Sequence, residues 1–134
     1  MTNRRRTDIR GERGQTAVEF ALVAPLLVVL LLGIIQFGIA FHNYVTITDA
    51  ARAGARKAIV ARFSGLSTTD IQQAVRDAAS DLDQSQLGIT VSDPTWSTPG
   101  SDVTVTVTYP YSINLLGWVV KSGDLTSTMK ERLE

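Results

Sequence analysis

The sequence predicts an α+β fold, in which a long N-terminal helix packs on a small antiparallel sheet beside a second, short helix. Three observations predict it. An uncharged run begins at Phe20 and lasts 29 residues, to Thr48. Apolar residues then recur every three or four positions up to about residue 62, which is the period of a helix. Further along, residues 102–109 alternate between apolar and polar side chains, which is the period of a strand.

Length and composition exclude several classes of protein before any motif is considered. The chain has 134 residues, which suffices for one small domain and one attached element. It contains no cysteine, which excludes disulfides and thiolate metal sites, and its single histidine, His42, disfavours histidine catalysis and zinc binding. The formal net charge is zero, which offers no overall attraction to nucleic acid. The charge is uneven, because residues 1–14 hold five arginines against Asp8 and Glu12 and so carry +3.

The segment 20–41 is predicted to cross a membrane. Its only strongly polar side chain is Gln36, and as a helix it would extend about 33 Å, enough for a hydrocarbon core of about 30 Å. A buried helix of a soluble domain is one alternative, but the rest of the chain is too short to enclose it. A cleaved signal peptide is the other, although the apolar region of such peptides is usually only about 7–15 residues. The arginines before the segment favour a cytoplasmic N-terminus, although basic residues also follow it.

The helix is expected to continue beyond the membrane as an amphipathic segment, 42–62, giving roughly 45 residues in all. Pro25 should kink or locally loosen it near its start, because proline supplies no N–H to its turn, and Gly65 is the expected stop. Small residues in the amphipathic segment allow another backbone to approach closely, although alanine is also simply a good helix former. These helix-packing candidates are Ala51, Gly54, Ala55 and Ala58.

Residues 63–134 are predicted to form a compact extracytoplasmic α+β domain. Ser67 and Thr68 are candidate N-caps for a helix of about 15 residues. Its apolar face would carry Ile71, Val75, Ala78 and Leu82.

Three strands are expected after that helix: 87–92, the alternating segment, and a last strand within 124–134, with a loop at 110–123 before it. Three short strands cannot close a core unaided, so the apolar face of the helix at 44–60 is expected to cover the sheet. Trp96 and Trp118 fall in expected loops, either in the core or on an exposed contact patch, and we favour the core.

The sequence offers no constellation for catalysis, a metal or a cofactor, and the protein is predicted not to be an enzyme. It has no glycine-flanked nucleophile, phosphate-binding loop, dinucleotide fingerprint or HExxH motif. Asp77, Asp81 and Asp83 lie close together but lack the calcium-loop pattern, which favours a solvated acidic face. The arginine run at 4–6, next to a membrane segment, is expected to hold the N-terminus at anionic lipid rather than to bind nucleic acid.

The junction before the membrane segment carries a compound motif: a basic leader ending in Gly14, four further residues, then Glu19 and Phe20. This arrangement resembles the cleavage site of type IV prepilins, particularly of the Flp branch, in which prepilin peptidase cuts after the glycine. Across residues 11–62, including "GQTAVEFALVAPLLVVLLLGIIQFG" and "DAARAGARKA", the sequence resembles the TadE family of pseudopilins from tight-adherence pilus systems.

The resemblance implies a pilin-like protein with three parts: a leader, 1–14, removed between Gly14 and Gln15; a helix, 15–62; and the domain 63–134. It implies that Glu19, with Phe20 beside it, pairs with the terminal amine of a neighbouring subunit. It also implies a minor pilin or pseudopilin in the bacterial cytoplasmic membrane, with its N-terminus cytoplasmic, that supports pilus biogenesis and adhesion.

The implied partners are prepilin peptidase, other Tad/Flp pilins and pseudopilins, the pilus assembly platform and the lipid bilayer, with no nucleic acid and no cofactor. The alternative is an unprocessed, single-pass membrane protein whose extracytoplasmic domain binds a partner.

Overall fold

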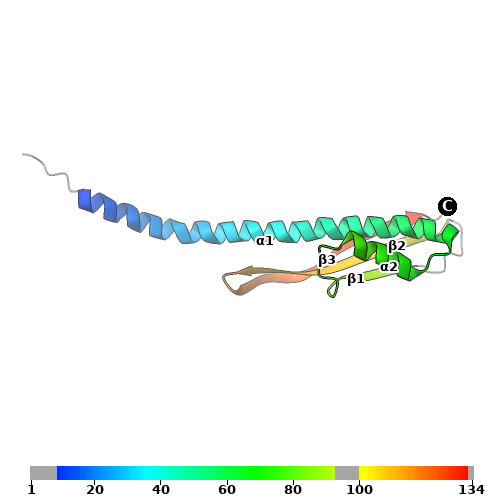
Figure 1. Cartoon of the computed structure of the whole chain (residues 1–134). Coiled ribbons are helices and arrows are strands. Elements are labelled where there is room, and N and C mark those ends of the chain that lie inside the picture. The colour runs from blue at the N-terminus through cyan, green and yellow to red at the C-terminus, as the bar shows by residue number, and fades with distance from the viewer. Residues whose placement is uncertain (1–8, 93–99, 133–134) are drawn as a thin grey trace, which may run out of the picture.

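A computed structural model describes residues 9–92 and 100–132, and it confirms the α+β arrangement (Figure 1). The elements follow in the order α1 (Ile9–Ser64), α2 (Thr68–Ala78), β1 (Gly88–Ser92), β2 (Asp102–Leu115) and β3 (Trp118–Arg132). Figure 1 shows that the C-terminal half of α1 lies along the sheet with α2, while its N-terminal half projects beyond the rest of the protein.

Helix α1 contains 56 residues and is therefore longer than the roughly 45 expected from the apolar pattern. It begins before Gly14, and it continues without interruption through Pro25. Figure 1 shows a gradual curve in this half rather than a break. Gly65, with φ of 64°, ends α1 where the sequence predicted a stop, because glycine adopts left-handed backbone without a steric penalty.

Helix α2 begins with a complete capping box. The backbone N–H of Ser67 donates to Asp70 Oδ2 at 2.7 Å, and the N–H of Asp70 donates to Ser67 Oγ at 3.4 Å. These two hydrogen bonds satisfy donors that the first turn of a helix otherwise leaves free. The N–H and the hydroxyl of Ser67 both donate to Asp70 Oδ2, and they hold the pKa of Asp70 below its ordinary value because they stabilise the carboxylate.

The C-terminal end of α2 differs from the prediction. The helix has 11 residues rather than about 15, and Ala79 rather than Ala78 occupies the buried position after Val75. Leu82 is buried as predicted, but from the turn after the helix. The side-chain amide of Gln84 donates to the carbonyls of Ala79 and Leu82, at 2.6 and 3.1 Å. These bonds satisfy the carbonyl groups of that turn and allow the chain to leave the helix early.

The sheet is antiparallel in the order β1-β2-β3. Val103, Val105 and Val107 point to its buried face, as the alternation predicted. On the opposite face, Thr106 and Thr128 lie across the two strands from each other, with their hydroxyl oxygens 3.2 Å apart.

The predicted loop at 110–123 is wrong, because these residues form the distal part of a long β2–β3 hairpin. Pairing continues from Asp102↔Arg132 to Leu115↔Trp118, with an irregularity at Ile113/Asn114. Strand β1 stops pairing with β2 at Thr108. Pro110 therefore lies where β2 has an open edge, which is a sheet position that tolerates proline.

The core lies where the C-terminal half of α1, helix α2 and one face of the sheet meet, as expected for a helix that covers the sheet. Its completely buried large side chains come from all three layers. These are Ile47, Ile71, Val75, Val103, Val105 and Val107. A small sheet gains stability when a helix packs on its apolar face, and here α1 and α2 cover that face.

Candidate processing and assembly site

The residues of the predicted processing motif lie on the exposed N-terminal half of α1. Gly14, Gln15, Glu19 and Phe20 are all exposed, and all have helical backbone. A Cβ atom added at Gly14 would meet nothing within 4 Å, so no part of the described protein shields this position. The motif is therefore accessible to another protein.

Gln15 and Glu19 lie on the same face of α1, one turn apart. Gln15 Nε2 donates a hydrogen bond to Glu19 Oε1 at 3.1 Å. An i,i+4 spacing places the two side chains as neighbours, about 6 Å apart along the helix axis. The Glu19 carboxylate thus turns toward the end of the helix that a cut before Gln15 would create.

The helix after this motif is apolar and uncovered. One helix in the described part of the chain, within Gly14–Ala61, is long and apolar enough to cross a membrane, and no part of its most apolar window is buried. A core helix of a soluble domain would be mostly buried. The exposed apolar helix is thus a candidate single-pass membrane anchor, consistent with the predicted segment 20–41.

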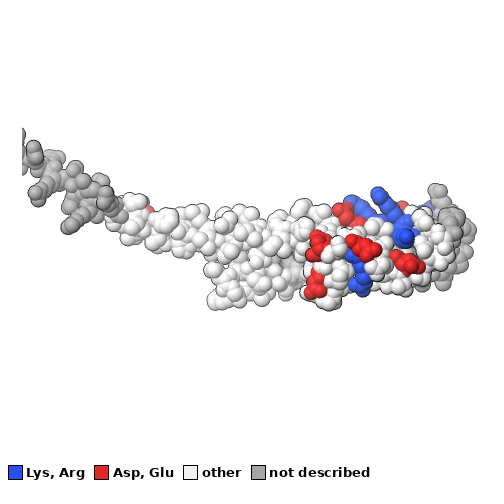
Figure 2. All heavy atoms as spheres, in the orientation of Figure 1, with Lys and Arg blue, Asp and Glu red and all other residues white. Residues whose placement is uncertain are grey.

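The charged side chains are distributed to match such an anchor. In the view of Figure 2, lysine, arginine, aspartate and glutamate side chains gather over the C-terminal body, while the long helical stretch before it is white except for a small acidic patch beside the grey atoms at its N-terminal end. Charged groups are costly in hydrocarbon, so the white stretch is the part of the surface that suits the bilayer and the coloured body suits water.

The small residues of α1 pack against the protein's own domain. Ala51, Gly54, Ala55 and Ala58 are all buried. A Cβ atom at Gly54 would lie 2.5 Å from Val75 Cγ2 on α2 and 3.1 Å from Val105 Cγ1 on β2. The close backbone approach considered from the sequence therefore occurs within one chain, where α2 and the sheet meet α1.

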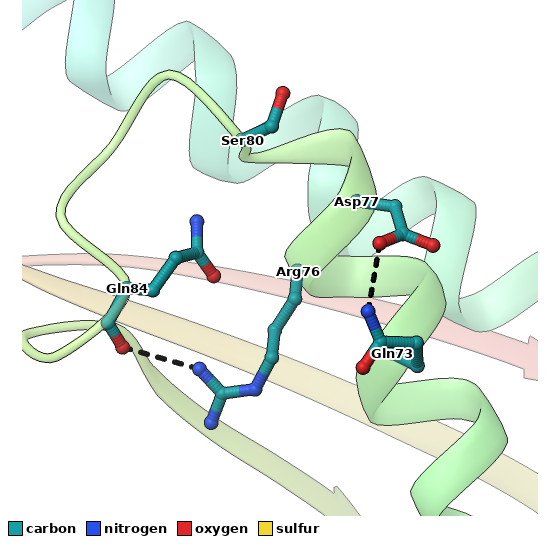
Figure 3. A pocket seen from close by; sticks show the side chains of 5 residues that line it. All are labelled: Gln73, Arg76, Asp77, Ser80 and Gln84. Atoms are coloured by element: carbon teal, nitrogen blue, oxygen red, sulfur yellow. Dashed lines mark hydrogen bonds between the residues drawn. The ribbon is translucent and has the colours of Figure 1, made fainter.

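A shallow pocket of about 260 Å³ lies at the end of α2, lined by Gln73, Arg76, Asp77, Ser80 and Gln84 (Figure 3). Most of its polar groups are already paired. Arg76 Nη1 donates to the Gln84 carbonyl at 3.1 Å, and Gln73 Nε2 donates to Asp77 Oδ1 at 2.8 Å. Gln84 Oε1 is buried without a hydrogen-bond partner.

The three aspartates near α2 do not converge on one point. Asp77 accepts from Gln73, Asp81 contacts His42, and Asp83 accepts hydrogen bonds from Ser85 and Gln86 that hold its pKa below the ordinary value. Among the side chains of residues 14–61, 64–92 and 100–132, no group of three or more His, Cys, Asp or Glu is placed to hold a metal ion.

One contact was missed by sequence reasoning. His42 Nε2 lies 3.0 Å from Asp81 Oδ2, and the Thr46 hydroxyl donates to the same oxygen at 3.4 Å. These contacts join α1, just beyond its apolar segment, to the turn after α2. Because 39 residues separate His42 from Asp81, no local pattern of spacing indicates the pair.

Taken with the fold, these features define a helix-anchored α+β protein with an accessible motif at the start of its apolar helix. The family model described as TadE-like protein matches residues 14–56. The match begins at Gly14 and covers the part of the chain where the sequence resembled that family, and so confirms the resemblance there. No curated protein and no solved structure gave a significant match.

Proposed function

We propose that this chain is a non-enzymatic minor pilin or pseudopilin of a Flp/Tad pilus system. In this role it is held in the cytoplasmic membrane by α1, is processed by a prepilin peptidase between Gly14 and Gln15, and supports the biogenesis of a pilus used in adhesion. The observation that carries the proposal is the position of the family match, which starts at Gly14 and runs through the exposed apolar helix.

The proposed orientation follows from the leader. Five arginines precede Gly14, and moving them across a bilayer is costly. The leader therefore stays in the cytoplasm, which keeps the bond after Gly14 at the cytoplasmic face of the membrane. A membrane-embedded peptidase reaches the bond there.

Cleavage requires a local change in α1, because proteases bind an extended backbone and residues 14 and 15 are helical. Glycine inside a helix is less stable than alanine by about 1 kcal/mol, so the helix opens more readily at Gly14 than at its neighbours. Its lack of a side chain also allows the backbone to approach the protease closely.

Glu19 has a proposed role after cleavage. Gln15 then carries a new α-ammonium group, and the Glu19 carboxylate lies on the same helix face four residues later. A carboxylate near the N-terminus of a helix is favoured by the macrodipole by up to about 1 kcal/mol. In a filament, the carboxylate binds the terminal amine of a neighbouring subunit, where the surrounding apolar helices strengthen the attraction.

The test is the mass of the N-terminus after co-expression with a prepilin peptidase of a Flp/Tad pilus system. The expected product begins at Gln15 and has lost the 14-residue leader. A matched culture with a catalytically inactive peptidase should yield the chain with residues 1–14 intact.

Two other results would contradict the proposal. A chain that keeps its leader in both cultures would favour the unprocessed, partner-binding membrane protein. A new terminus near Phe41 would instead indicate release by signal peptidase.

A further inference from the structure

The distal end of the β2–β3 hairpin carries an apolar surface that the core does not use. The stretch 103–120 contains 18 residues without a formal charge. Its first half packs in the core, but its last residues do not: Trp118 is 82% exposed, Leu116 is 71% exposed, and Val119 and Val120 are each 63% exposed. A contiguous group of large apolar side chains at one end of a protein indicates a contact surface. We call residues 115–120 the hairpin tip.

The hairpin tip lies beside the apolar segment of α1. Figure 1 shows the hairpin running back along α1 toward its N-terminal half. Residues 109–112 of β2 line a pocket together with Gln36, Ile39, Ala40 and Asn43 of α1. The strand continues from Ser112 to Leu115, a further distance of about 10 Å. The tip therefore extends past the contact with α1 residues 36–43, alongside the part of α1 that has no protein cover.

The turn at the tip has an unusual residue for its conformation. Leu116 and Gly117 have φ angles of 51° and 87°, so both central residues of this two-residue turn are left-handed. Such turns favour Asn-Gly or Asp-Gly, and a bulky leucine there is strained. An exposed leucine at this position stabilises neither the turn nor the core, which suggests that its apolar side chain serves an external contact.

We propose that the hairpin tip inserts into the outer face of the lipid bilayer and forms a second membrane contact beside α1. The exposed tryptophan suits the boundary between headgroups and acyl chains, where tryptophan is enriched. Lys121 follows the apolar residues directly and is exposed, so its ammonium group reaches the headgroups. The proposal rests on the membrane anchor of the proposed function, but not on cleavage or on pilus assembly.

The backbone limits how deep the tip goes. Beyond Thr108, β2 has no neighbour on its outer edge, and β3 is the edge strand of the sheet throughout. Unpaired N–H and C=O groups are costly in the hydrocarbon core. The tip therefore stays near the headgroup boundary, where water still reaches these edges while the four exposed side chains contact acyl chains. Because the tip lies on the N-terminal side of the contact with α1 residues 36–43, this depth places the outer end of the membrane-crossing part of α1 before residue 36 rather than at the predicted residue 41. Two contacts, α1 and the tip, fix how the domain faces the membrane.

The experiment uses Trp118 as a depth probe in the full chain. A Trp96→Phe change leaves Trp118 as the single tryptophan. The protein is placed at one copy per nanodisc of phosphatidylcholine and phosphatidylglycerol, in which the lipids carry bromine either near the headgroups or deep in the acyl chains. Bromine quenches tryptophan only at short range. The expected result is a loss of about half of the emission with shallow bromines and a smaller loss with deep ones.

A matched control places the only tryptophan elsewhere on the same strand. Thr126→Trp, combined with Trp96→Phe and Trp118→Phe, puts the probe at an exposed site paired with Thr108, on the part of the hairpin within the domain. This probe should be quenched by aqueous acrylamide and unaffected by brominated lipid. Leu116→Asn should lower the shallow quenching of Trp118 while leaving the turn intact, because asparagine accepts left-handed backbone.

Three results would overturn the proposal, and each has a different meaning. If the chain stays in the disc and Trp118 is quenched only by acrylamide, the tip lies in water. If Trp118 becomes shielded from acrylamide only in discs with two copies, the tip binds a second copy of the chain. If the chain does not stay in the disc at all, neither α1 nor the hairpin tip binds the membrane, and the membrane anchor of the proposed function is contradicted as well. Failure of leader cleavage, by contrast, would leave the quenching unchanged and would overturn only the processing part of the proposed function.

Discussion

Gly54 on α1 faces Val75 on α2 at a distance that leaves no room for a side chain. A Cβ atom at residue 54 would lie 2.5 Å from Val75 Cγ2, with Val105 Cγ1 at 3.1 Å on the other side. The valine side chains are β-branched and stiff, so they cannot swing aside easily. The absence of a side chain at residue 54 therefore allows α1 to pack closely against both α2 and β2.

Gly54→Ala should destabilise the domain despite the higher helix propensity of alanine. Overpacking of a tight core lowers the free energy of unfolding by about 1–3 kcal/mol, whereas the higher helix propensity of alanine raises it by about 1 kcal/mol. The net effect is a decrease of about 1 kcal/mol. The measurement is thermal unfolding of the full chain in detergent, followed by near-ultraviolet circular dichroism.

Two further variants separate overpacking from other causes. Gly33→Ala, at a site of α1 with nothing within 4 Å of a new Cβ, should not destabilise. In a Val75→Ala background, which removes the clashing methyl group, Gly54→Ala should become neutral or stabilising. A loss of the same size in both backgrounds would contradict the packing explanation.

Ser67→Ala should lower the stability of the domain by about 1 kcal/mol, because it removes the side-chain half of the capping box of α2. Ser80→Ala is the matched control, since Ser80 is exposed and lies just after the same helix. The control should change the free energy of unfolding by less than about 0.5 kcal/mol. Equal effects of the two substitutions would argue against capping as the cause.

Acid should destabilise the domain through three exposed aspartates. Hydrogen bonds from Ser67 lower the pKa of Asp70, hydrogen bonds from Ser85 and Gln86 lower that of Asp83, and a hydrogen bond from Lys130 lowers that of Asp102. A folded-state pKa below the unfolded one means that the unfolded chain binds protons first as the pH falls.

The resulting stability is therefore complete above the ordinary aspartate pKa of about 4 and is lost as the pH falls through the lower, folded-state values. Urea unfolding at several pH values between 6 and 2.5 measures this slope. Asp70→Asn with Asp83→Asn should flatten it, and an unchanged slope in that double variant would assign acid sensitivity to other groups.

The sequence predicted the parts of this fold that have a regular period and predicted poorly the parts that do not. The alternation at Val103, Val105 and Val107 identified the buried face of β2 because the opposite face is wet. The hairpin tip lacks that contrast, since its residues are apolar on both sides and exposed on both sides. Without an alternating pattern, Pro110 and the run from Leu115 to Val120 looked like a loop.

The environment of Trp118, in the same segment, was also predicted poorly from the sequence. The core position favoured for Trp118 is wrong, because its side chain is 82% exposed at the start of β3. Trp96 lies outside the described residues. The motif at Gly14 and Glu19, by contrast, could be recognised from the sequence because its residues lie close together: a glycine, a carboxylate and an apolar run in fixed order.

Substitutions at Gly14 should change processing according to the side chain added. Gly14→Ala should slow the removal of the leader, because alanine favours the helix that has to open. Gly14→Val should block removal, because a β-branched side chain prevents close approach of the backbone to the peptidase. The measurement is the ratio of precursor to product over time after induction, read by mass.

The structure offers a matched control for that pair. Gly38→Val changes a glycine of the same helix that also has nothing within 4 Å of a new Cβ, but far from the leader. It should leave the rate of processing unchanged. Normal cleavage of the Gly14→Val chain would contradict the assignment of Gly14 to the peptidase site.

Glu19→Ala should separate assembly from processing. The carboxylate is exposed, and its described contact is with Gln15, so its loss should leave the fold, membrane insertion and leader removal largely intact. The terminal amine of a neighbouring subunit then has no carboxylate to bind, and piliation should fall strongly.

Glu19→Gln keeps the shape and the hydrogen-bonding oxygen but not the charge, so it distinguishes ion pairing from hydrogen bonding. Gln15→Ala removes only the intrahelical hydrogen bond and should leave piliation close to that of the unaltered chain. Full piliation by the Glu19→Ala chain, with normal levels of processed protein, would show that Glu19 makes no assembly contact.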